Sequence, residues 1–197
     1  GAEALARWIH PVDGIRPPAA FIPRFEKNGF ISQLDLYMFE ETCRIKSTWK
    51  GTKYEHIPIS INMSRLHLYN QAYPDQLVEI AGRYQIPTNE LEVTENIFLK
   101  DSSELIRMIN QLQDRGFMIS IDDFGSGFSA LNLLKDLNAN TIKLDREFLS
   151  NSSNSTRGKK IIRNVIALCL DLKMDVVTEG IETKDQIDFI TRCGCQI

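Results

Sequence analysis

The chain has 197 residues, of which 43% are hydrophobic and 25% are charged, and these are ordinary proportions for a globular domain. Its formal net charge of −3 argues against a nucleic-acid-binding coat, which is usually basic, so no DNA partner is expected. No apolar run approaches the roughly 18 residues that a membrane span needs, and the first residues carry no signal-peptide pattern. We therefore expect one cytoplasmic domain over residues 1–197, alone or as the cytoplasmic part of a larger protein.

The cysteines are consistent with a cytoplasmic domain. Without a secretory signal, all four are expected to be reduced thiols, and the Cys193-Gly-Cys195 spacing is too tight for a usual zinc site. The four are Cys43, Cys169, Cys193 and Cys195.

Strand-like and helix-like segments alternate along the whole chain. Apolar residues recur at helical intervals in some segments and at alternate positions in others. Repeated alternation of the two predicts parallel strands joined by right-handed crossovers. In chain order, the expected elements are a strand in Ala2–Trp8, a helix in Ser32–Trp49, a strand in His56–Met63, a helix in Gln71–Tyr84, a strand in Glu90–Thr94, a helix in Ser102–Arg115, strands in Phe117–Asp122 and Thr141–Leu144, a mobile loop in Ser150–Thr156, a helix in Lys159–Leu172, a strand in Asp175–Glu179 and a helix in Thr183–Arg192.

Three segments at the expected strands place apolar and polar residues at alternate positions. They are Leu91–Thr94, Ile119–Asp122 and Ile142–Asp145, and in each the polar residues share one face because strand side chains alternate sides. An open doubly wound sheet would be apolar on both faces. The interior of a (β/α) barrel holds the active site at the carboxyl ends of its strands, so the pattern favours a barrel over a flavodoxin-like sheet.

Polar residues at the strand ends would gather at the mouth of such a barrel. Oxygen donors dominate this set, which has no His or Cys, and they select Mg²⁺ or Mn²⁺ rather than zinc or copper. Two ions about 3.5–4 Å apart would suit so many carboxylates, and two ions with a lysine and Arg7 are typical of phosphate-ester chemistry. The set is Glu3, Asn62, Glu92, Asp122, Asp123, Lys143, Asp145, Glu179 and Glu182.

The adjacent pair Asp122-Asp123 is the most informative member of this set. Two neighbouring carboxylates without an adjacent cation repel each other, so they need a proton, hydrogen bonds or a metal. The glycines of the following segment, Phe124–Leu131, can take positive φ. That segment is therefore either an ordinary turn or a hinge that carries Asp123.

Ordinary structural roles remain open for the same residues. The alternatives are a surface acid or salt-bridge partner for Glu92 and Glu179, a solvent-facing acid at the start of the Thr183–Arg192 helix for Glu182, a local pair with Arg146 for Asp145, and a loop cap with Ser64 for Asn62. Recurrence of one residue type at strand after strand favours a site over these alternatives. His10, His56 and His67 lie in unrelated contexts and are not expected to be catalytic, and Trp8, Trp49 and the phenylalanines are expected in the core.

At these residues the chain resembles the EAL family of cyclic diguanylate (c-di-GMP) phosphodiesterases. The resemblance covers essentially the whole chain, in the order expected for the family. The segments that carry it are Glu3-Ala-Leu5, Arg7-Trp8, His10-Pro11, Phe21-Ile-Pro23, Asn62-Met-Ser64, Glu92-Val-Thr-Glu95, Asp122-Asp-Phe-Gly125, Lys143-Leu-Asp145, Glu179-Gly-Ile-Glu182 and Gly194-Cys195.

The resemblance implies a modified TIM barrel that hydrolyses c-di-GMP to linear pGpG with two Mg²⁺ or Mn²⁺ ions. Asp122 is expected to bridge the two ions. The implied metal ligands are Glu3, Asn62, Glu92 and Asp122 for the first ion, and Asp122, Asp123 and Glu179 for the second.

It also implies roles beyond metal binding. The residues with implied catalytic roles are Lys143, which would hold or polarise the attacking water, Glu182, Glu3 and Asp122. The residues expected to bind substrate are Arg7 and Asp145. Glu95 resembles the residue that anchors the Asp123–Leu131 loop, which in this family couples dimerisation to metal binding.

Several expectations concern the wider protein. The family's first strand, before Glu3-Ala-Leu5, and its Gln-Gly-Tyr segment on the last strand are not in this sequence, so we expect a barrel incomplete at both ends. A homodimer is expected, and a sensor or diguanylate cyclase domain often accompanies the family. The alternative function is an inactive receptor of the EAL type, which binds c-di-GMP without cleaving it.

Overall fold

The computed structural model describes residues 1–87, 89–125, 134, 135, 137–153 and 155–195. The expected Asp123–Leu131 loop lies outside these residues from residue 126 onward. The chain divides into two compact units. The first comprises Gly1–Glu92 and Arg107–Met118, and the second comprises Val93–Ile106 and Ile119–Ile197.

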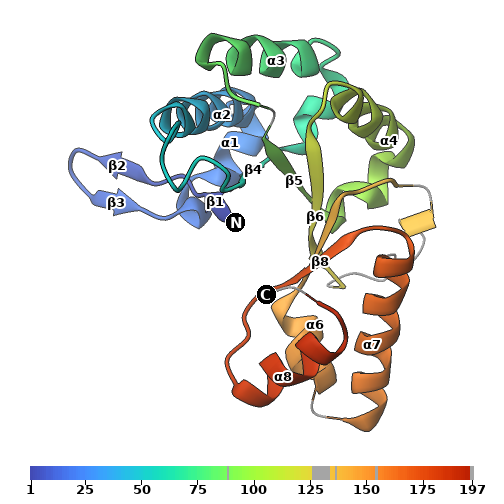
Figure 1. The fold of residues 1–197 in the computed structure, drawn as a ribbon. Helices are drawn as coiled ribbons and strands as arrows, with labels where there is room; N and C mark the ends of the chain where they lie inside the picture. The colour runs from blue at the N-terminus through green and yellow to red at the C-terminus, as the bar shows by residue number, and fades with distance from the viewer. Residues whose placement is uncertain (88, 126–133, 136, 154, 196–197) are drawn as a thin grey trace. The chain divides into compact units, whose positions relative to one another are not determined.

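The strands of the main sheet follow one another in chain order. They are β1 (Ala2–Ala4), β4 (Ile59–Asn62), β5 (Glu90–Thr94), β6 (Met118–Phe124), β7 (Thr141–Leu144) and β8 (Asp175–Thr178) (Figure 1). Strands β1 and β4, β4 and β5, β6 and β7, and β7 and β8 pair in parallel. The predicted alternation of strands and helices is confirmed, and the bounds of β5 and β7 are those predicted. Such alternation is what parallel neighbouring strands require, because they cannot be joined by a tight turn.

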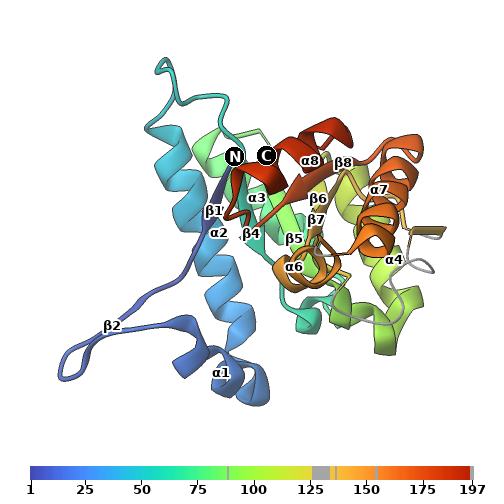
Figure 2. The same ribbon diagram turned by 90° about the horizontal axis from the view of Figure 1, so that it is seen from below.

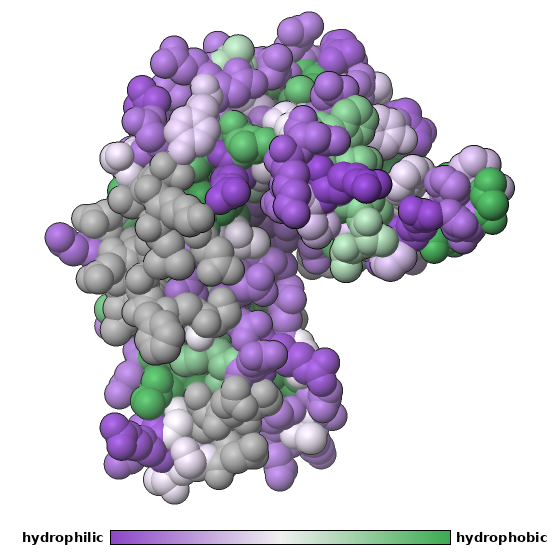
Figure 3. All heavy atoms as spheres, turned by 180° about the vertical axis from the view of Figure 1, so that it is seen from behind, coloured by the Kyte–Doolittle hydropathy of each residue, from purple (hydrophilic) through white to green (hydrophobic). Residues whose placement is uncertain are grey.

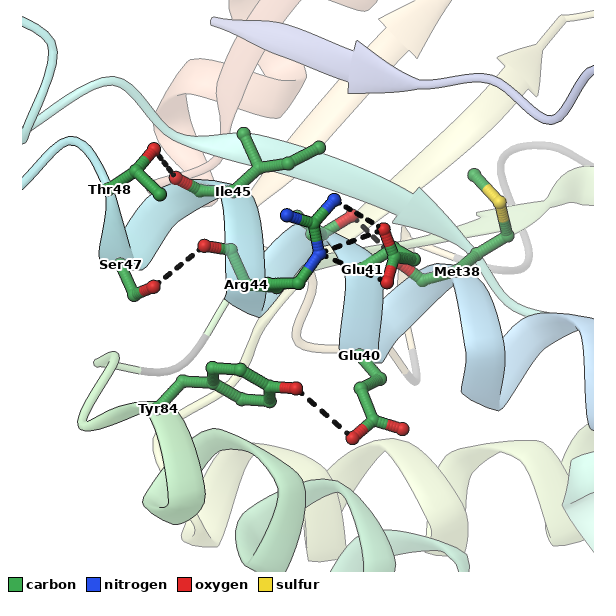
Figure 4. Close-up of polar contacts among 9 residues, drawn as sticks. Met38, Glu40, Glu41, Arg44, Ile45, Ser47, Thr48 and Tyr84 are labelled. Carbon is green, nitrogen blue, oxygen red and sulfur yellow. Dashed lines mark hydrogen bonds and ion pairs between the residues drawn. The ribbon is translucent and has the colours of Figure 1, made fainter.

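The first unit also contains several helices. They are α1 (Ile22–Asn28), α2 (Ile31–Ser47), α3 (Tyr73–Tyr84) and the last turns of α4 (Phe98–Asp114), with the 3-10 helices η1 (Pro18–Ala20) and η2 (Arg65–Tyr69). Helix α2 buries Phe39, whose ring lies 5.9 Å from that of Phe117. On the outer side, the Tyr84 hydroxyl of α3 donates to Glu40 of α2, and the pair of Glu41 with Arg44 lies along α2 (Figure 4).

A two-stranded hairpin in the first unit was not predicted. It consists of β2 (Trp8–His10) and β3 (Gly14–Arg16), which pair in antiparallel fashion and extend away from α2 (Figure 2). The expected strand over Ala2–Trp8 was wrong beyond Ala4, because β1 ends there and Trp8 belongs to a separate strand, which turns back at Pro11–Asp13 to pair with β3. Trp8 is 38% exposed rather than in the core, although its ring contacts Phe21.

The outer face of this hairpin is apolar. Ile9 and Ile15 are direct partners across the two strands, and both are largely exposed, as is Val12 at the tip. Figure 3 shows hydrophobic residues on this projecting part of the first unit.

The second unit contains β6, β7, β8 and their helices. These are η3 (Glu95–Ile97), the first turns of α4, α6 (Arg146–Ser153), α7 (Thr156–Asp171) and α8 (Lys184–Arg192). The core includes Ile121, Ile142 and Ile166, all fully buried. Thr183 and Gln186 form a capping box at the start of α8, which satisfies backbone donors of its first turn.

The predicted mobile loop over Ser150–Thr156 was wrong for residues 150–153 and 156, which are helical, whereas residue 154 lies outside the described residues. Helix α6 continues to Ser153, and α7 begins at Thr156 with Ser155 as its N-cap. The Ser- and Asn-rich composition favours a loop, but Asp145 caps the start of α6, and Leu149 is buried. Among the described residues, no helix combines the length and the apolar character that crossing a membrane requires.

The thiols give a test of this packing. All four cysteines are free; burial raises the pKa values of Cys43, Cys169 and Cys195 to about 11, whereas Cys193 is half-buried. A raised pKa keeps a thiol protonated at pH 8, and the thiolate is the reactive form. We expect a disulfide reagent such as DTNB to modify one thiol rapidly in the native chain at pH 8, and Cys193→Ser to abolish that phase. Rapid modification that persists in Cys193→Ser would contradict the burial of the other three.

Candidate active site

Lys143 joins two acids at the carboxyl ends of the strands in the second unit. Lys143 lies on β7, and only 7% of the residue is exposed. Its Nζ lies 2.6 Å from Oε1 of Glu179, which directly follows β8, and 3.5 Å from Oδ1 of Asp122 on β6. The parallel pairing of β6, β7 and β8 brings these strand ends together, so their side chains converge as predicted for this unit.

A bulge in β6 presents the two adjacent aspartates. Ile121 pairs with Ile142, and Phe124 pairs with Leu144, so Asp122 and Asp123 together stand opposite the single residue Lys143. Such a bulge bends the strand and re-aims side chains, and bulges often lie beside active sites. Asp123 also has a φ of 56°, a left-handed conformation that Asp tolerates better than most residues.

Asp123 lies in a negative environment. Burial raises the pKa of its carboxyl group, and the neighbouring carboxylates of Asp122, Asp145 and Glu179 raise this pKa further. Lys143 acts in the opposite direction and lowers it. A divalent cation would relieve the repulsion among the carboxylates that lie around Lys143.

Asp145 and Glu182 are engaged in local structure. Asp145 Oδ1 accepts hydrogen bonds from the backbone N–H groups of Glu147 and Phe148, at 2.8 and 3.0 Å, and so caps α6. Arg146 pairs with Glu182 instead of Asp145, and the Glu182 side chain is 63% exposed. These contacts leave the substrate role of Asp145 and the catalytic role of Glu182 as predictions.

The first unit holds a second group of predicted ligands. Asn62, the last residue of β4, donates from Nδ2 to Oε1 of Glu3 on β1 over 2.8 Å. Asn62 is also the strand partner of Glu92 on β5, which is only 2% exposed. Glu92 is therefore not a surface acid, and the loop cap belongs to Ser64, whose Oγ accepts from Leu66 N.

Arg7 lies in the first unit, between β1 and β2. Its Nη1 donates to the carbonyl oxygen of Ala6 at 2.8 Å. Arg7 borders an open, mainly apolar cavity of about 390 Å³. The lining residues are Ala6, Arg7, Trp8, Phe21, Phe25, Phe30, Leu34, Tyr37 and Met38.

Glu95 contacts the segment that follows β6. It is buried at the start of η3, and its Oε2 accepts a hydrogen bond from the Gly125 N–H over 2.8 Å. Gly125 has a φ of 97°, and a side chain there would meet Phe148 of α6. The geometry ties the first residue after β6 to the start of η3 and to α6.

The donor types suit a hard cation in both units. Carboxylate oxygens and one amide oxygen are the ligands that Mg²⁺ and Mn²⁺ prefer. Among the described residues, however, no three Asp, Glu, His or Cys side chains are spaced as an assembled metal site. The chemistry of the donors therefore fits the expected ions, and the metal ligands remain predictions.

Residues 1–197 match the family described as EAL domain. The chain belongs to this family. It is 35% identical over 197 residues to the bifunctional diguanylate cyclase/cyclic di-GMP phosphodiesterase MucR of Pseudomonas aeruginosa, covering 99% of this chain and 29% of that protein. It is 34% identical over 194 residues to the probable cyclic di-GMP phosphodiesterase PdeG of Escherichia coli, covering 98% of this chain and 38% of that protein.

Solved structures show the same fold. The structure titled PaMucR phosphodiesterase, c-di-GMP complex, has a TM-score of 0.87 at 35% identity, covering 98% of this chain and 79% of that one. The EAL domain of Mycobacterium smegmatis DcpA has a TM-score of 0.75 at 29% identity, over 83% and 75% of the two chains. The predicted modified TIM barrel is therefore confirmed as the fold class. The present chain spans only about a quarter to two fifths of the curated relatives MucR, PdeG and DosP, the E. coli oxygen sensor protein.

Sequence reasoning missed the role of Arg146. Its side chain lies over Gly180, whose φ is 65°, and a Cβ at Gly180 would lie 2.5 Å from Cγ of Arg146. With its ion pair to Glu182, Arg146 holds the segment after β8 that begins with Glu179. The glycine between Glu179 and Ile181 was the one available signal, because a close approach often requires glycine.

Two glycines give a matched test of the segment after β6. Gly125→Ala would force a side chain into the left-handed region and against Phe148, so we expect a loss of about 2 kcal/mol or more in unfolding free energy. Gly82→Ala meets open space within α3 and should raise this free energy by about 0.5–1 kcal/mol. Urea unfolding measures both. Equal effects of the two substitutions would contradict the close packing at Gly125.

Proposed function

We propose that this chain is a metal-dependent phosphodiesterase that hydrolyses c-di-GMP to linear pGpG. The observation that carries the proposal is the contact of Lys143 with Asp122 and Glu179 at three adjacent strand ends. Membership of the EAL domain family supports it, as do the names of the relatives MucR and PdeG. Every acid expected from the family resemblance, from Glu3 to Glu182, is present in the chain.

The proposed cofactors are two Mg²⁺ or Mn²⁺ ions. When bound, such ions activate water and stabilise negative charge on phosphoryl oxygens. The proposed ligands are Glu3, Asn62, Glu92 and Asp122 for one ion, and Asp122, Asp123 and Glu179 for the other. The support for this assignment is the oxygen chemistry of these side chains and their positions at strand ends.

Lys143 is proposed to orient the attacking water. Its ammonium group already lies beside two proposed ligands, and an ammonium carries three N–H donors. A water molecule held there would face the carboxylates rather than bulk solvent. Glu182 is proposed to support ordered water at the site from its exposed position beside Arg146.

Arg7 and Asp145 are proposed to bind substrate. A guanidinium group can donate two parallel hydrogen bonds to a phosphate, which fits the phosphodiester of c-di-GMP. Asp145 uses Oδ1 to cap α6, so any substrate contact would use its other oxygen. Glu95 is proposed to anchor the loop that begins at Asp123, through its bond to Gly125.

Further proposals concern the whole protein. The names of MucR and DosP include a cyclase activity and an oxygen sensor, and the chain covers 29% and 25% of those proteins. We propose that a sensor or cyclase domain accompanies this chain, that the protein is cytoplasmic, and that it acts as a homodimer.

Product analysis tests the activity. The purified protein, incubated with c-di-GMP and Mn²⁺, should yield pGpG by chromatography, and EDTA should abolish the product. Asp122→Asn should lower the rate by about 100-fold or more, because charge stabilisation by metal ions contributes several kcal/mol. Asp75→Asn is the control, because Asp75 is an exposed acid on α3 paired with Arg115. Tight binding of c-di-GMP without product would instead establish a receptor.

The two adjacent aspartates should differ in metal binding. By calorimetry with Mn²⁺, Asp122→Asn should weaken the binding of both ions, whereas Asp123→Asn should weaken mainly one. Asn tolerates the left-handed backbone of Asp123, so the second substitution changes charge with little strain. Identical binding curves for the two variants would contradict the proposed bridging role of Asp122.

A further inference from the structure

A buried polar pair lies in the first unit, beside the end of β4. Asp35 on α2 and His67 on η2 are 7% and 1% exposed, and Asp35 Oδ2 lies 3.0 Å from His67 Nε2. The His67 ring stacks on Tyr73, with centroids 3.7 Å apart and an interplanar angle of 19°. The hydrogen bond at Nε2 and the stack on Tyr73 therefore fix the position of this imidazole.

The same carboxylate also holds the backbone. Asp35 Oδ2 accepts a hydrogen bond from the Ser64 N–H over 2.9 Å, and Ser64 lies two residues after Asn62. Between them, the Met63 N–H donates to the Glu92 carbonyl oxygen over 2.9 Å. The turn after β4 is thus attached to α2 and η2 on one side and to β5 on the other.

Stability alone is a poor explanation for such a pair. Burying a carboxylate costs free energy that its hydrogen bonds only offset, and an apolar pair of similar volume is often as stabilising or more so. A hydrogen-bonded carboxylate does fix geometry, because it accepts from two donors in set directions. The fixed element here is the turn that follows Asn62.

The position of the turn after β4 affects the orientation of the Asn62 side chain. Its Nδ2 donates to Glu3, so its Oδ1 is the atom available to accept or to ligate. A shift of the turn would change where that oxygen points without changing which residues are present.

We propose that Asp35 and His67 are positioning residues that hold the turn after β4 and, through it, the side-chain amide of Asn62. Their effect on metal binding rests on the function proposed above. Neither residue is assigned a contact with metal or substrate. The helix α2 thereby becomes part of the support for the ligands of the first ion.

The positioning itself is tested in metal-free protein by NMR. The side-chain amide signals of Asn62, assigned by their loss in Asn62→Ala, should move toward free-amide values in Asp35→Ala. Asp35→Asn, which keeps an acceptor oxygen, should leave them near their original positions. Thr42→Val removes the hydrogen bond that the buried Thr42 of α2 donates to the Met38 carbonyl oxygen, and is the matched control. Unchanged Asn62 signals in Asp35→Ala would overturn the proposal.

A second variant covers the case in which Asp35→Ala does not fold. His67→Phe keeps the ring against Tyr73 but removes the partner of Asp35. The Asn62 signals should shift in this variant as well, by less than in Asp35→Ala, because Ser64 still donates to Asp35. Signals that stay in place in His67→Phe would remove His67 from the proposal.

A double-mutant cycle tests the functional consequence. Asp35→Ala should weaken Mn²⁺ binding by about 10- to 100-fold, the usual effect of residues that orient a metal ligand. In the Asn62→Ala background, it should have almost no further effect, because the two residues act in series. Additive losses would show that Asp35 acts elsewhere and would overturn the link. If the unaltered protein binds no Mn²⁺, the proposed function fails, while the NMR result still decides whether the pair holds Asn62.

Discussion

The contact of one buried lysine with two carboxylates is the interaction on which the candidate site depends. Three parallel strands, β6, β7 and β8, end at the same edge and carry Asp122, Lys143 and Glu179 there. A lysine in a buried position is costly unless it is paired, and carboxylates side by side repel each other. The positive charge of Lys143 offsets the repulsion between the carboxylates, and the carboxylates offset the free-energy cost of burying the lysine. The bulge in β6 increases the repulsion among carboxylates, because it places both Asp122 and Asp123 opposite Lys143.

The acids elsewhere are accommodated by neutral donors. Asn62 donates its amide to Glu3, the Gly125 N–H donates to Glu95, and the first turn of α6 donates to Asp145. A neutral donor holds a carboxylate in place without neutralising its charge. These hydrogen bonds therefore fix the position of each carboxylate, as binding a cation or orienting another ligand requires. Asp123 differs, because burial and then the neighbouring carboxylates raise its pKa, and a bound cation would act in the opposite direction.

Much of the fold was predictable because period-two patterns are local. The bounds of β5 and β7 follow from alternation over a few residues, and the polar strand ends identified Glu92 and Lys143 before their burial was known. The hairpin of β2 and β3 escaped because strands of three residues carry almost no periodic signal. The helix over Ser150–Ser153 escaped because its own composition favours a loop, whereas its support, the Asp145 cap and the buried Leu149, precedes it in the chain.

Contacts between distant residues set the limit of prediction within the site. Asp35 and His67 are 32 positions apart, and nothing in the sequence around either residue indicates that their side chains form a hydrogen bond. Likewise, Arg146 and Glu182 meet only because β7 and β8 are neighbours. Such pairs depend on strand order and register, so they become visible only when the elements are assembled.

If the acids at the strand ends form a cation site, Mn²⁺ should stabilise the folded chain, and thermal unfolding with and without Mn²⁺ measures this directly. A ligand that binds only the folded state at 100 times its dissociation constant adds about 2.7 kcal/mol of stability. We expect Mn²⁺ to raise the melting temperature of the unaltered protein and to have little effect on that of Asp122→Asn. A melting temperature that is the same with and without Mn²⁺ in the unaltered protein would contradict a cation site formed by these acids.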